Sequence, residues 1–305
     1  MIIAVTGATG FLGRYIVKRL VEDGHRCRCW HRPGSDRTGF DDVQDRITWI
    51  AGDLTAPEGF DDFCRGAEAV VHSALYRAEG VGFRAAADDH FEAFIRANLL
   101  GSLQLMAAAR RRNVGRFVFI STCAVHEEIL DDRPLDEAHP LWPATHYGAH
   151  KAAIEKFIHS FGLGGGWPVC AVRPTGIYGV AHPAPKSRWF DIVRQVCRGG
   201  AFASEGGGKE VHAADVARAV ALLLDASVEK ITGQAFNCCD RYVADRSVAR
   251  LAREISGSNA EITGENSGPK HQIDTGKLQA LGMTFGGEAL LRETIGQLVA
   301  AAQAG

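Results

Sequence analysis

The stretch "IIAVTGATGFLG", residues 2–13, decides the fold of this chain. Its first half is a short apolar run, which is typical of a strand buried in a parallel sheet. Its second half has the spacing G-x-x-G-x-x-G at Gly7, Gly10 and Gly13, and an amphipathic helical pattern runs over residues 11–23. A side chain at Gly7 or Gly10 would block the approach of the backbone to a pyrophosphate, and the following helix N-terminus favours an anion. Strand, glycine turn and helix in this order predict a dinucleotide-binding loop. Its contact residues are expected to be Gly7, Thr9, Gly10, Phe11, Leu12 and Gly13.

Short apolar runs alternate with helical patterns along the first 240 residues. Helices are predicted at residues 11–23, 91–112, 146–161 and 213–225. The expected buried strands are "IIAVTG", "RCRCW", "ITWIAGD", "AVVHSA", "RFVFIS", "PVCAVRP" and "QAFNCC". This alternation predicts an α/β fold, a Rossmann-type doubly wound parallel sheet.

The alternation weakens at residues 181–208 and after residue 240, where only helical and loop patterns are recognised. We therefore expect residues 1–175 and 211–240 to form a dinucleotide-binding Rossmann domain. Residues 176–210 and 241–305 are expected to form a small, mostly helical lobe that binds substrate beside the carboxyl edge of the sheet.

Composition excludes several classes of partner. The chain has 305 residues, 46% hydrophobic and 23% charged, with a formal net charge of −2, so neither nucleic acid nor an anionic membrane is expected to bind it. No apolar run approaches the roughly 20 residues that span a bilayer, and no signal peptide is recognised, which favours a cytoplasmic protein. The eight cysteines lack zinc-site spacing, so free thiols and no metal are expected.

The second strand is expected to end at the adenosine ribose, where an acid favours a free 2′-hydroxyl and an arginine favours a 2′-phosphate. Here the segment reads "CWHRPGS", and Arg32 and Ser35, helped by His31, suit a phosphate. Asp36 lies further along and is expected to be solvated. NADP is therefore favoured over NAD, although NAD remains possible and Arg32 is alternatively a plain surface residue.

Two further strand ends are expected to contact the cofactor. "AGDL" brings Asp53, with Leu54 beside it, within reach of the adenine amino group, and small Ser73 and Ala74 in "HSAL" leave room for the nicotinamide half. His72 is interpreted as a packed strand residue rather than a catalyst.

The segment "YGAHK" has Tyr147 and Lys151 four residues apart, and residues i and i+4 share a helix face. A tyrosine pKa of about 10 is too high for a base at neutral pH, and a nearby ammonium lowers it. The pair therefore predicts proton transfer by Tyr147.

The ordered motifs resemble those of extended short-chain dehydrogenases/reductases, the NAD-dependent epimerase/dehydratase-like group. They are "TGATGFLG", "GDL", "VVHSA", "ANLLGSLQLMAAARRRNVGRFVFISTCAV", "YGAHK", "VRPTGIYG" and "VHAADVARAV". The resemblance implies that Tyr147 exchanges a proton with a substrate oxygen and that Lys151 also holds the nicotinamide ribose. It implies that Thr122, with Ser121 as the alternative, hydrogen-bonds the reacting oxygen. Asn98, Pro174 and Thr175 are implied cofactor-side residues.

The chain departs from that pattern at positions that matter for substrate. Cys123 and Ala124 replace the acid pair that dehydratases carry, which argues against dehydration. Gly176 and Lys209 replace the asparagine and the diphosphate-binding arginine of many epimerases, so a nucleotide sugar is in doubt.

Substrate contacts are expected from the lobe and from loops at the sheet edge. His126 is a candidate, or alternatively a polar loop residue, and the aromatic candidates alternatively form the core of the lobe. The candidates are Tyr76 with the loop at 77–90, His126, Tyr178, Arg188 and Trp189.

These observations predict an NAD(P)-dependent oxidoreductase that transfers a hydride between nicotinamide and a carbonyl or secondary alcohol of a small molecule. The alternatives are a sugar epimerase that retains its cofactor and a non-catalytic nucleotide sensor. The resemblance also implies a homodimer formed by the helices at 91–112 and 146–161, the first of which is apolar on more than one face.

Overall fold

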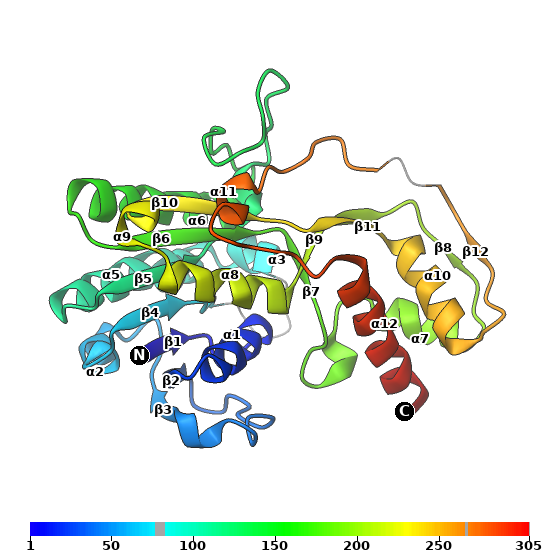
Figure 1. The fold of residues 1–305 in the computed structure, drawn as a ribbon, viewed down its shortest axis with the longest axis horizontal. Helices are drawn as coiled ribbons and strands as arrows, with labels where there is room; N and C mark the ends of the chain where they lie inside the picture. Colours follow the sequence, from blue (N-terminus) through cyan, green and yellow to red (C-terminus); the bar gives the residue numbers. More distant parts are fainter. Residues whose placement is uncertain (77–82, 266–267, 305) are drawn as a thin grey trace. The chain divides into compact units, whose positions relative to one another are not determined.

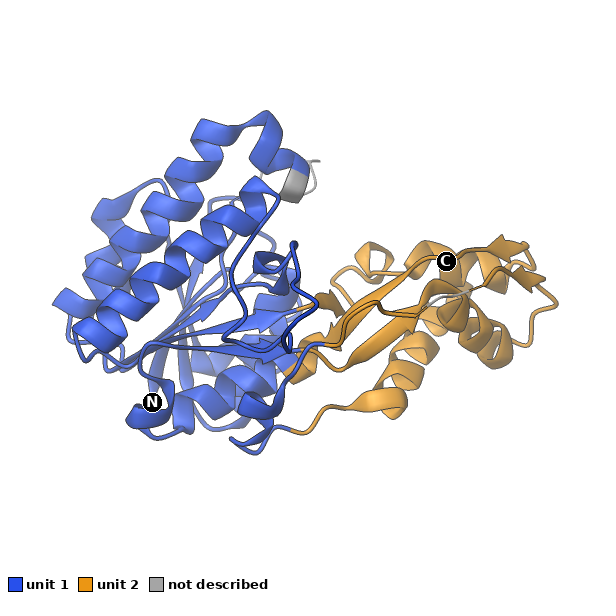
Figure 2. Ribbon diagram, turned by 90° about the horizontal axis from the view of Figure 1, so that it is seen from above, with its two compact units in different colours: residues 1–174, 216–238, 273–283 blue, residues 175–215, 239–272, 284–305 orange. Residues whose placement is uncertain are grey.

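The computed structural model describes residues 1–76, 83–265 and 268–304. They form two compact units, Met1–Pro174 with Val216–Cys238 and Ile273–Met283, and Thr175–Asp215 with Cys239–Gln272 and Thr284–Gly305 (Figure 2). The expected division differs at four segments, of which Thr175 and residues 239–240, expected in the Rossmann domain, belong to the second unit. Residues 273–283 were expected in the lobe and belong to the first unit, whereas residues 211–215 were expected in the Rossmann domain and belong to the second.

The first unit contains a seven-stranded sheet in the order β10-β6-β5-β4-β1-β2-β3 (Figure 1). Every pair of neighbours is parallel. The strands are β1 (Ile2–Thr6), β2 (Arg26–His31), β3 (Ile47–Ala51), β4 (Ala69–His72), β5 (Arg116–Ile120), β6 (Val169–Pro174) and β10 (Gln234–Cys238). All seven expected strands are present, and the doubly wound parallel fold is confirmed. The strand order reverses between β1 and β4, the place where such sheets bind ligands.

Helices cover both faces of this sheet (Figure 2). The buried side of α1 carries the apolar residues of its amphipathic pattern, Leu12, Ile16, Val17 and Leu20. The predicted helix at 91–112 is a run of α4, a π-helical segment at Arg96–Leu100, and α5. The helices around the sheet are α1 (Phe11–Glu22), α2 (Phe60–Cys64), α3 (Phe83–Asp89), α4 (Phe91–Ile95), α5 (Gly101–Arg111), α6 (His146–His159), α8 (Ala213–Asp225), α9 (Val228–Ile231) and α11 (Gly276–Gln279).

The second unit is less helical than the sequence predicted. It has a three-stranded sheet of β11 (Arg241–Ala244), β9 (Gly207–His212) and β7 (Gly176–Tyr178), and a two-stranded sheet of β12 (Ile262–Thr263) and β8 (Phe202–Ala203). The expectation that no strand follows residue 240 is therefore wrong at β11 and β12. Its helices are α7 (Phe190–Cys197), α10 (Asp245–Ser256) and α12 (Gly287–Ala304).

Within the described ranges, none of the helices combines the length and apolarity required to cross a membrane. All eight cysteines lie among the described residues, and each is a free thiol.

Candidate active site

The glycine loop is as tight as its sequence predicts. Gly7 has a φ of +70°, and a Cβ there would lie 2.7 Å from the backbone nitrogen of Ala74, at the end of β4. A Cβ on Gly13 would lie 1.9 Å from the carbonyl oxygen of Gly7. Helix α1 begins after Gly10, which supplies no side-chain cap, and no acidic residue lies in its first turn. The N–H groups at this end are therefore open to an anion.

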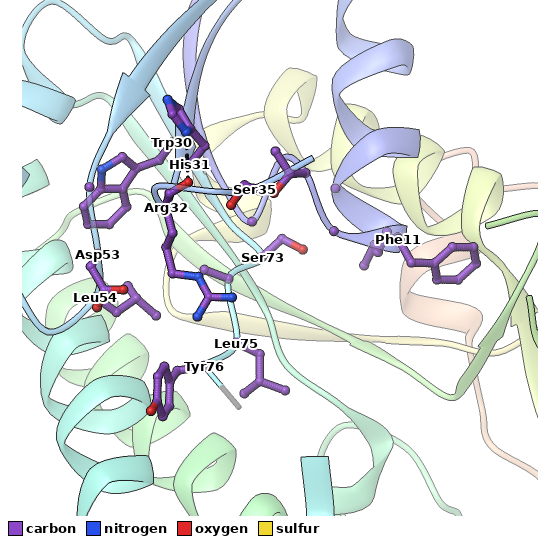
Figure 3. A pocket seen from close by; sticks show the side chains of 17 residues that line it. Phe11, Trp30, His31, Arg32, Ser35, Asp53, Leu54, Ser73, Leu75 and Tyr76 are labelled. Carbon is purple, nitrogen blue, oxygen red and sulfur yellow. Dashed lines mark hydrogen bonds between the residues drawn. The ribbon is translucent and has the colours of Figure 1, made fainter. Parts of the chain in front are cut away.

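A cavity of about 250 Å³ opens over this loop at the carboxyl ends of β1 to β4 (Figure 3). It brings together most residues expected to bind the cofactor, from four separate segments, together with Tyr76. Sequence reasoning missed Trp30, Gly52 and Leu75. The predicted residues in the lining are Gly7, Thr9, Gly10, Phe11, Leu12, Gly13, His31, Arg32, Ser35, Asp53, Leu54, Ser73, Ala74 and Tyr76.

Trp30 and Gly52 form one wall of the cavity. The indole stacks on Phe63 with 5.0 Å between ring centroids, and its Nε1 lies where a Cβ of Gly52 would be. That nitrogen is buried without a hydrogen-bond partner among the described residues. No local pattern could have predicted this contact, because Trp30 on β2 and Gly52, one residue after β3, are brought together only when the two strands pair in the sheet.

Arg32 is exposed at the end of β2, and its side chain extends across the cavity (Figure 3). Its backbone carbonyl accepts the N–H of Ser35 at 3.1 Å, which folds the "HRPGS" turn. Asp36 is exposed, as expected of a solvated residue, while its carboxylate accepts from the N–H and hydroxyl of Thr38 at 2.9 and 2.6 Å and lies 3.6 Å from Arg14. The acid is thus engaged away from the cavity, and Arg32 is the charged side chain at this strand end in the lining.

A chain of hydrogen bonds holds the backbone of Ala74, which lines the cavity. His72 Nδ1 lies 2.6 Å from the hydroxyl of Thr6, which accepts the Ala74 N–H, and His72 Nε2 lies 2.8 Å from the hydroxyl of Ser102. Burial lowers the pKa of His72 to about 3, so the ring is neutral. His72 is therefore a packed strand residue, as interpreted from the sequence.

Asn98 continues this support without lining the cavity. Its side chain accepts the Tyr76 N–H at 2.7 Å and donates to the Tyr76 carbonyl at 2.9 Å. It thereby holds the backbone of Tyr76. Of the loop expected at 77–90, residues 77–82 lie outside the described residues, whereas Phe83–Asp89 form α3.

The segment "YGAHK" lies at the start of α6, where the Thr145 hydroxyl caps the helix by accepting the Gly148 N–H at 3.1 Å. Lys151 is 5% exposed, and its Nζ donates to the Ile120 carbonyl at 2.7 Å, at the end of β5. Burial lowers the pKa of Lys151 to about 7, and the charge of Glu155 opposes that change. Tyr147 is half-buried one turn before it.

Ser121 and Thr122 differ in what their hydroxyls contact. Ser121 donates to Glu155 on α6. The Thr122 hydroxyl accepts the Ala124 N–H at 3.1 Å, which leaves its own proton for another acceptor. The structure therefore favours Thr122 over Ser121 as the hydroxyl available to a ligand.

Four expected substrate residues have other surroundings. His126 is buried, with Nδ1 3.2 Å from the Pro140 carbonyl and Nε2 3.1 Å from Arg173, so the alternative of a polar loop residue fits better. Tyr178 and Trp189 lie in the core of the second unit, which is the alternative that the sequence allows for them. Arg188 pairs with buried Glu210 at 2.5 Å while its side chain stays 42% exposed. Pro174 and Thr175 lie at the end of β6, outside the lining of the cavity.

Known proteins match this chain over most of its length. The model of the NAD dependent epimerase/dehydratase family matches residues 3–239. A ceramide reductase of Caulobacter vibrioides is 31% identical over 179 residues, 58% of this chain and 47% of that protein. The 4-hydroxy-2-methyl-3-oxo-4-farnesyl-3,4-dihydroquinoline-1-oxide ketoreductase of Stigmatella aurantiaca is 32% identical over 234 residues, 68% of this chain and 66% of that protein. The chain thus spans between about half and two thirds of these curated relatives.

Among solved structures, the UDP-glucose 4-epimerase of Thermus thermophilus in complex with NAD aligns with a TM-score of 0.78. It is 23% identical, and the alignment covers 98% of this chain and 99% of that one. At this identity the likeness shows a shared fold.

Proposed function

This chain belongs to the NAD-dependent epimerase/dehydratase family, and from that premise we propose that it is an NADP-preferring oxidoreductase. It transfers a hydride between nicotinamide and a carbonyl or secondary alcohol of a small molecule. The observation that carries this is the cavity in which the glycine loop and Arg32 meet, in the same unit as the helix with Tyr147 and Lys151. Curated relatives named as a reductase and a ketoreductase support carbonyl chemistry.

The residues of the cavity fit a dinucleotide. The missing Cβ atoms of Gly7 and Gly13 and the uncapped start of α1 leave a cradle for a pyrophosphate. Arg32, with Ser35 near it in the lining, would hold a 2′-phosphate through charge-assisted hydrogen bonds. Ser73 and Ala74 present small side chains at the end of β4, where the nicotinamide half is expected.

Each catalytic residue has a distinct task in this proposal. When bound, the nicotinamide supplies or accepts the hydride. Tyr147 gives a proton to the substrate oxygen in reduction and takes it back in oxidation, Thr122 hydrogen-bonds that oxygen, and the Lys151 ammonium favours the phenolate. Lys151 can carry this charge only in part near neutral pH, because burial has lowered its pKa to about 7.

Cofactor exchange separates a dehydrogenase from an epimerase, the second candidate that the family allows. An epimerase returns the hydride to the same molecule and has no need to release its cofactor, whereas a dehydrogenase exchanges it at each turnover. Arg32 in the cavity, with Asp36 engaged elsewhere, supports exchange with an NADP pool.

We therefore expect the purified protein to carry little nicotinamide after dialysis and to bind added NADPH with a dissociation constant in the micromolar range. Absorbance of the released cofactor and a fluorescence titration measure both quantities. Stoichiometric nicotinamide that survives gel filtration, with no net redox change during turnover, would instead support epimerisation.

We also propose a homodimer formed by the run α4 to α5 and by α6. Phe91, Leu100 and Phe157 on these helices are 46%, 48% and 44% exposed, whereas Phe94 and Met106 face the core. Exposed apolar side chains on neighbouring helices favour a two-fold interface.

Leu100→Glu is expected to shift the protein from dimer to monomer at micromolar concentration, because a charge would be buried in the interface. Light scattering measures the mass. Ile255→Glu, a comparably exposed apolar residue on α10 of the second unit, serves as the control and should leave the mass unchanged. A wild-type monomer would contradict the proposal.

A further inference from the structure

A buried carboxylate links α6 and the end of β5, which carry the proposed catalytic residues, to the end of β6. Glu155 on α6 is 1% exposed and accepts a hydrogen bond from the Ser121 hydroxyl, just beyond β5. Arg173 at the end of β6 is also 1% exposed and donates to Glu155 from Nη2 at 2.6 Å and from Nε at 3.1 Å. Both carboxylate oxygens are therefore engaged, and the charges of Glu155 and Arg173 compensate each other.

Each member of this group is next to a residue of the proposed active site. Ser121 precedes Thr122, and Arg173 precedes Pro174. Glu155 is four residues after Lys151 on α6, so the two side chains share a helix face. Movement of Glu155 would thus change the position of β5 relative to α6, the two elements that the Lys151 hydrogen bond to Ile120 joins.

The group extends to the loop after β5. Arg173 Nη1 lies 3.1 Å from His126 Nε2, while His126 Nδ1 faces the Pro140 carbonyl at 3.2 Å. Burial and the charge of Arg173 lower the pKa of His126 to about 4, so this ring is neutral and accepts from Arg173. The charge in the group therefore remains on Glu155 and Arg173.

Lys151 has few charged neighbours to stabilise its ammonium. His72 on β4 and His150 on α6 face it, and burial lowers the pKa of each to about 3, so both are neutral. Tyr147 lies one turn before it on α6, and Arg173 is hydrogen-bonded to the carboxylate of Glu155. Glu155 is thus the group whose negative charge raises the pKa of Lys151 against the effect of burial.

We propose that Glu155 is a positioning residue of the active site: held by Ser121 and Arg173, it aligns β5 with α6, and its carboxylate favours the ammonium form of Lys151. This rests on the proposed function, because it assigns Glu155 an effect on the residue that holds the cofactor.

The test is the affinity for NADPH and NADH between pH 6 and 10, measured by fluorescence without any substrate. Wild-type affinity should fall as pH rises and Lys151 loses its proton. We call this fall the alkaline limb of the pH profile, and Lys151→Met should abolish it. Glu155→Gln removes the negative charge, so the limb should move to lower pH by about one unit. NADH is included because it lacks the 2′-phosphate of NADPH. Phosphate monoesters titrate at about pH 6, so a pH dependence seen with both dinucleotides does not come from that phosphate.

Two variants separate the charge of Glu155 from its hydrogen bonds. Ser121→Ala removes one hydrogen bond and keeps the charge, so the limb should stay at its wild-type pH. Glu155→Asp keeps the charge on a shorter side chain, so its limb should lie close to the wild-type pH even if the affinity itself is lower. Because Glu155→Gln leaves Arg173 buried without a counter-charge and can prevent folding, the double variant Glu155→Gln/Arg173→Gln is made in parallel and should show the same direction of shift.

The outcomes distinguish this inference from the proposed function. An affinity loss for Glu155→Gln that is equal at every pH, with the limb unmoved, would show a purely structural contact and overturn the inference. So would a wild-type affinity that does not change up to pH 10. Failure of the wild type to bind either dinucleotide would overturn the proposed function itself, and the inference with it.

Discussion

Tyr147→Phe is expected to lower turnover by at least about 100-fold, because groups that transfer a proton in the transition state typically contribute 10²–10⁴-fold. The substitution removes only the phenolic hydroxyl from a half-buried residue in the first turn of α6. The fold and the affinity for NADPH should therefore stay close to those of the wild type. Oxidation of NADPH with a panel of ketones, followed at 340 nm, first identifies a substrate and then measures the loss.

The matched control is Tyr15→Phe, which removes a phenol from α1 at a position outside the lining of the cavity. Its turnover should equal that of the wild type. If Tyr147→Phe also turned over at the wild-type rate, Tyr147 would not be the proton donor.

Arg32→Ala is expected to weaken NADPH binding by about 10- to 150-fold and to leave NADH binding nearly unchanged. Only NADPH has a 2′-phosphate, so only NADPH would lose its contact with the Arg32 guanidinium. A hydrogen bond to a charged group contributes about 1.5–3 kcal/mol. Arg32 is exposed, so the lower part of this range is the expected one. Fluorescence titration of both dinucleotides against both proteins measures the difference.

Arg37→Ala is the control for general charge effects. Arg37 is an exposed arginine five residues further along, with its guanidinium 5.8 Å from the Trp49 ring and outside the lining of the cavity. It should change neither affinity. An equal loss for NADPH and NADH in Arg32→Ala would show that Arg32 does not select the 2′-phosphate.

Patterns within short stretches of sequence predicted the first unit well. The inner strands of the parallel sheet are buried on both faces, so each appears as a near-continuous apolar run, and all six residues of β6 are indeed buried. The glycine spacing requires a close approach of backbone to backbone, which the structure shows at Gly7 and Gly13. These signals are local, so they can be recognised in the sequence before the packing partners of each segment are known.

The second unit and the support of the site were harder to predict because they depend on residues far apart in the chain. Strands β7 and β11 are short, and both pair with β9, which is distant from each of them in the chain, rather than being stabilised by their own pattern. The burial of His126 depends on Arg173, and that of Tyr178 on the core of the second unit. A polar or aromatic residue in a loop has the same local signal whether it faces a ligand or a core.

The sequence by itself determined the doubly wound sheet, the glycine loop and the Tyr147–Lys151 pair, because each depends on spacing along one strand or helix. Only the tertiary structure decided that Trp30 and Gly52 form a wall of the cavity and that buried Arg14 of α1 pairs with Asp36. It also decided that Glu155 holds Ser121 and Arg173 beside Lys151. The physical reason is that a buried charge or an inward ring is stable only with its partner, and these partners come from other strands and helices.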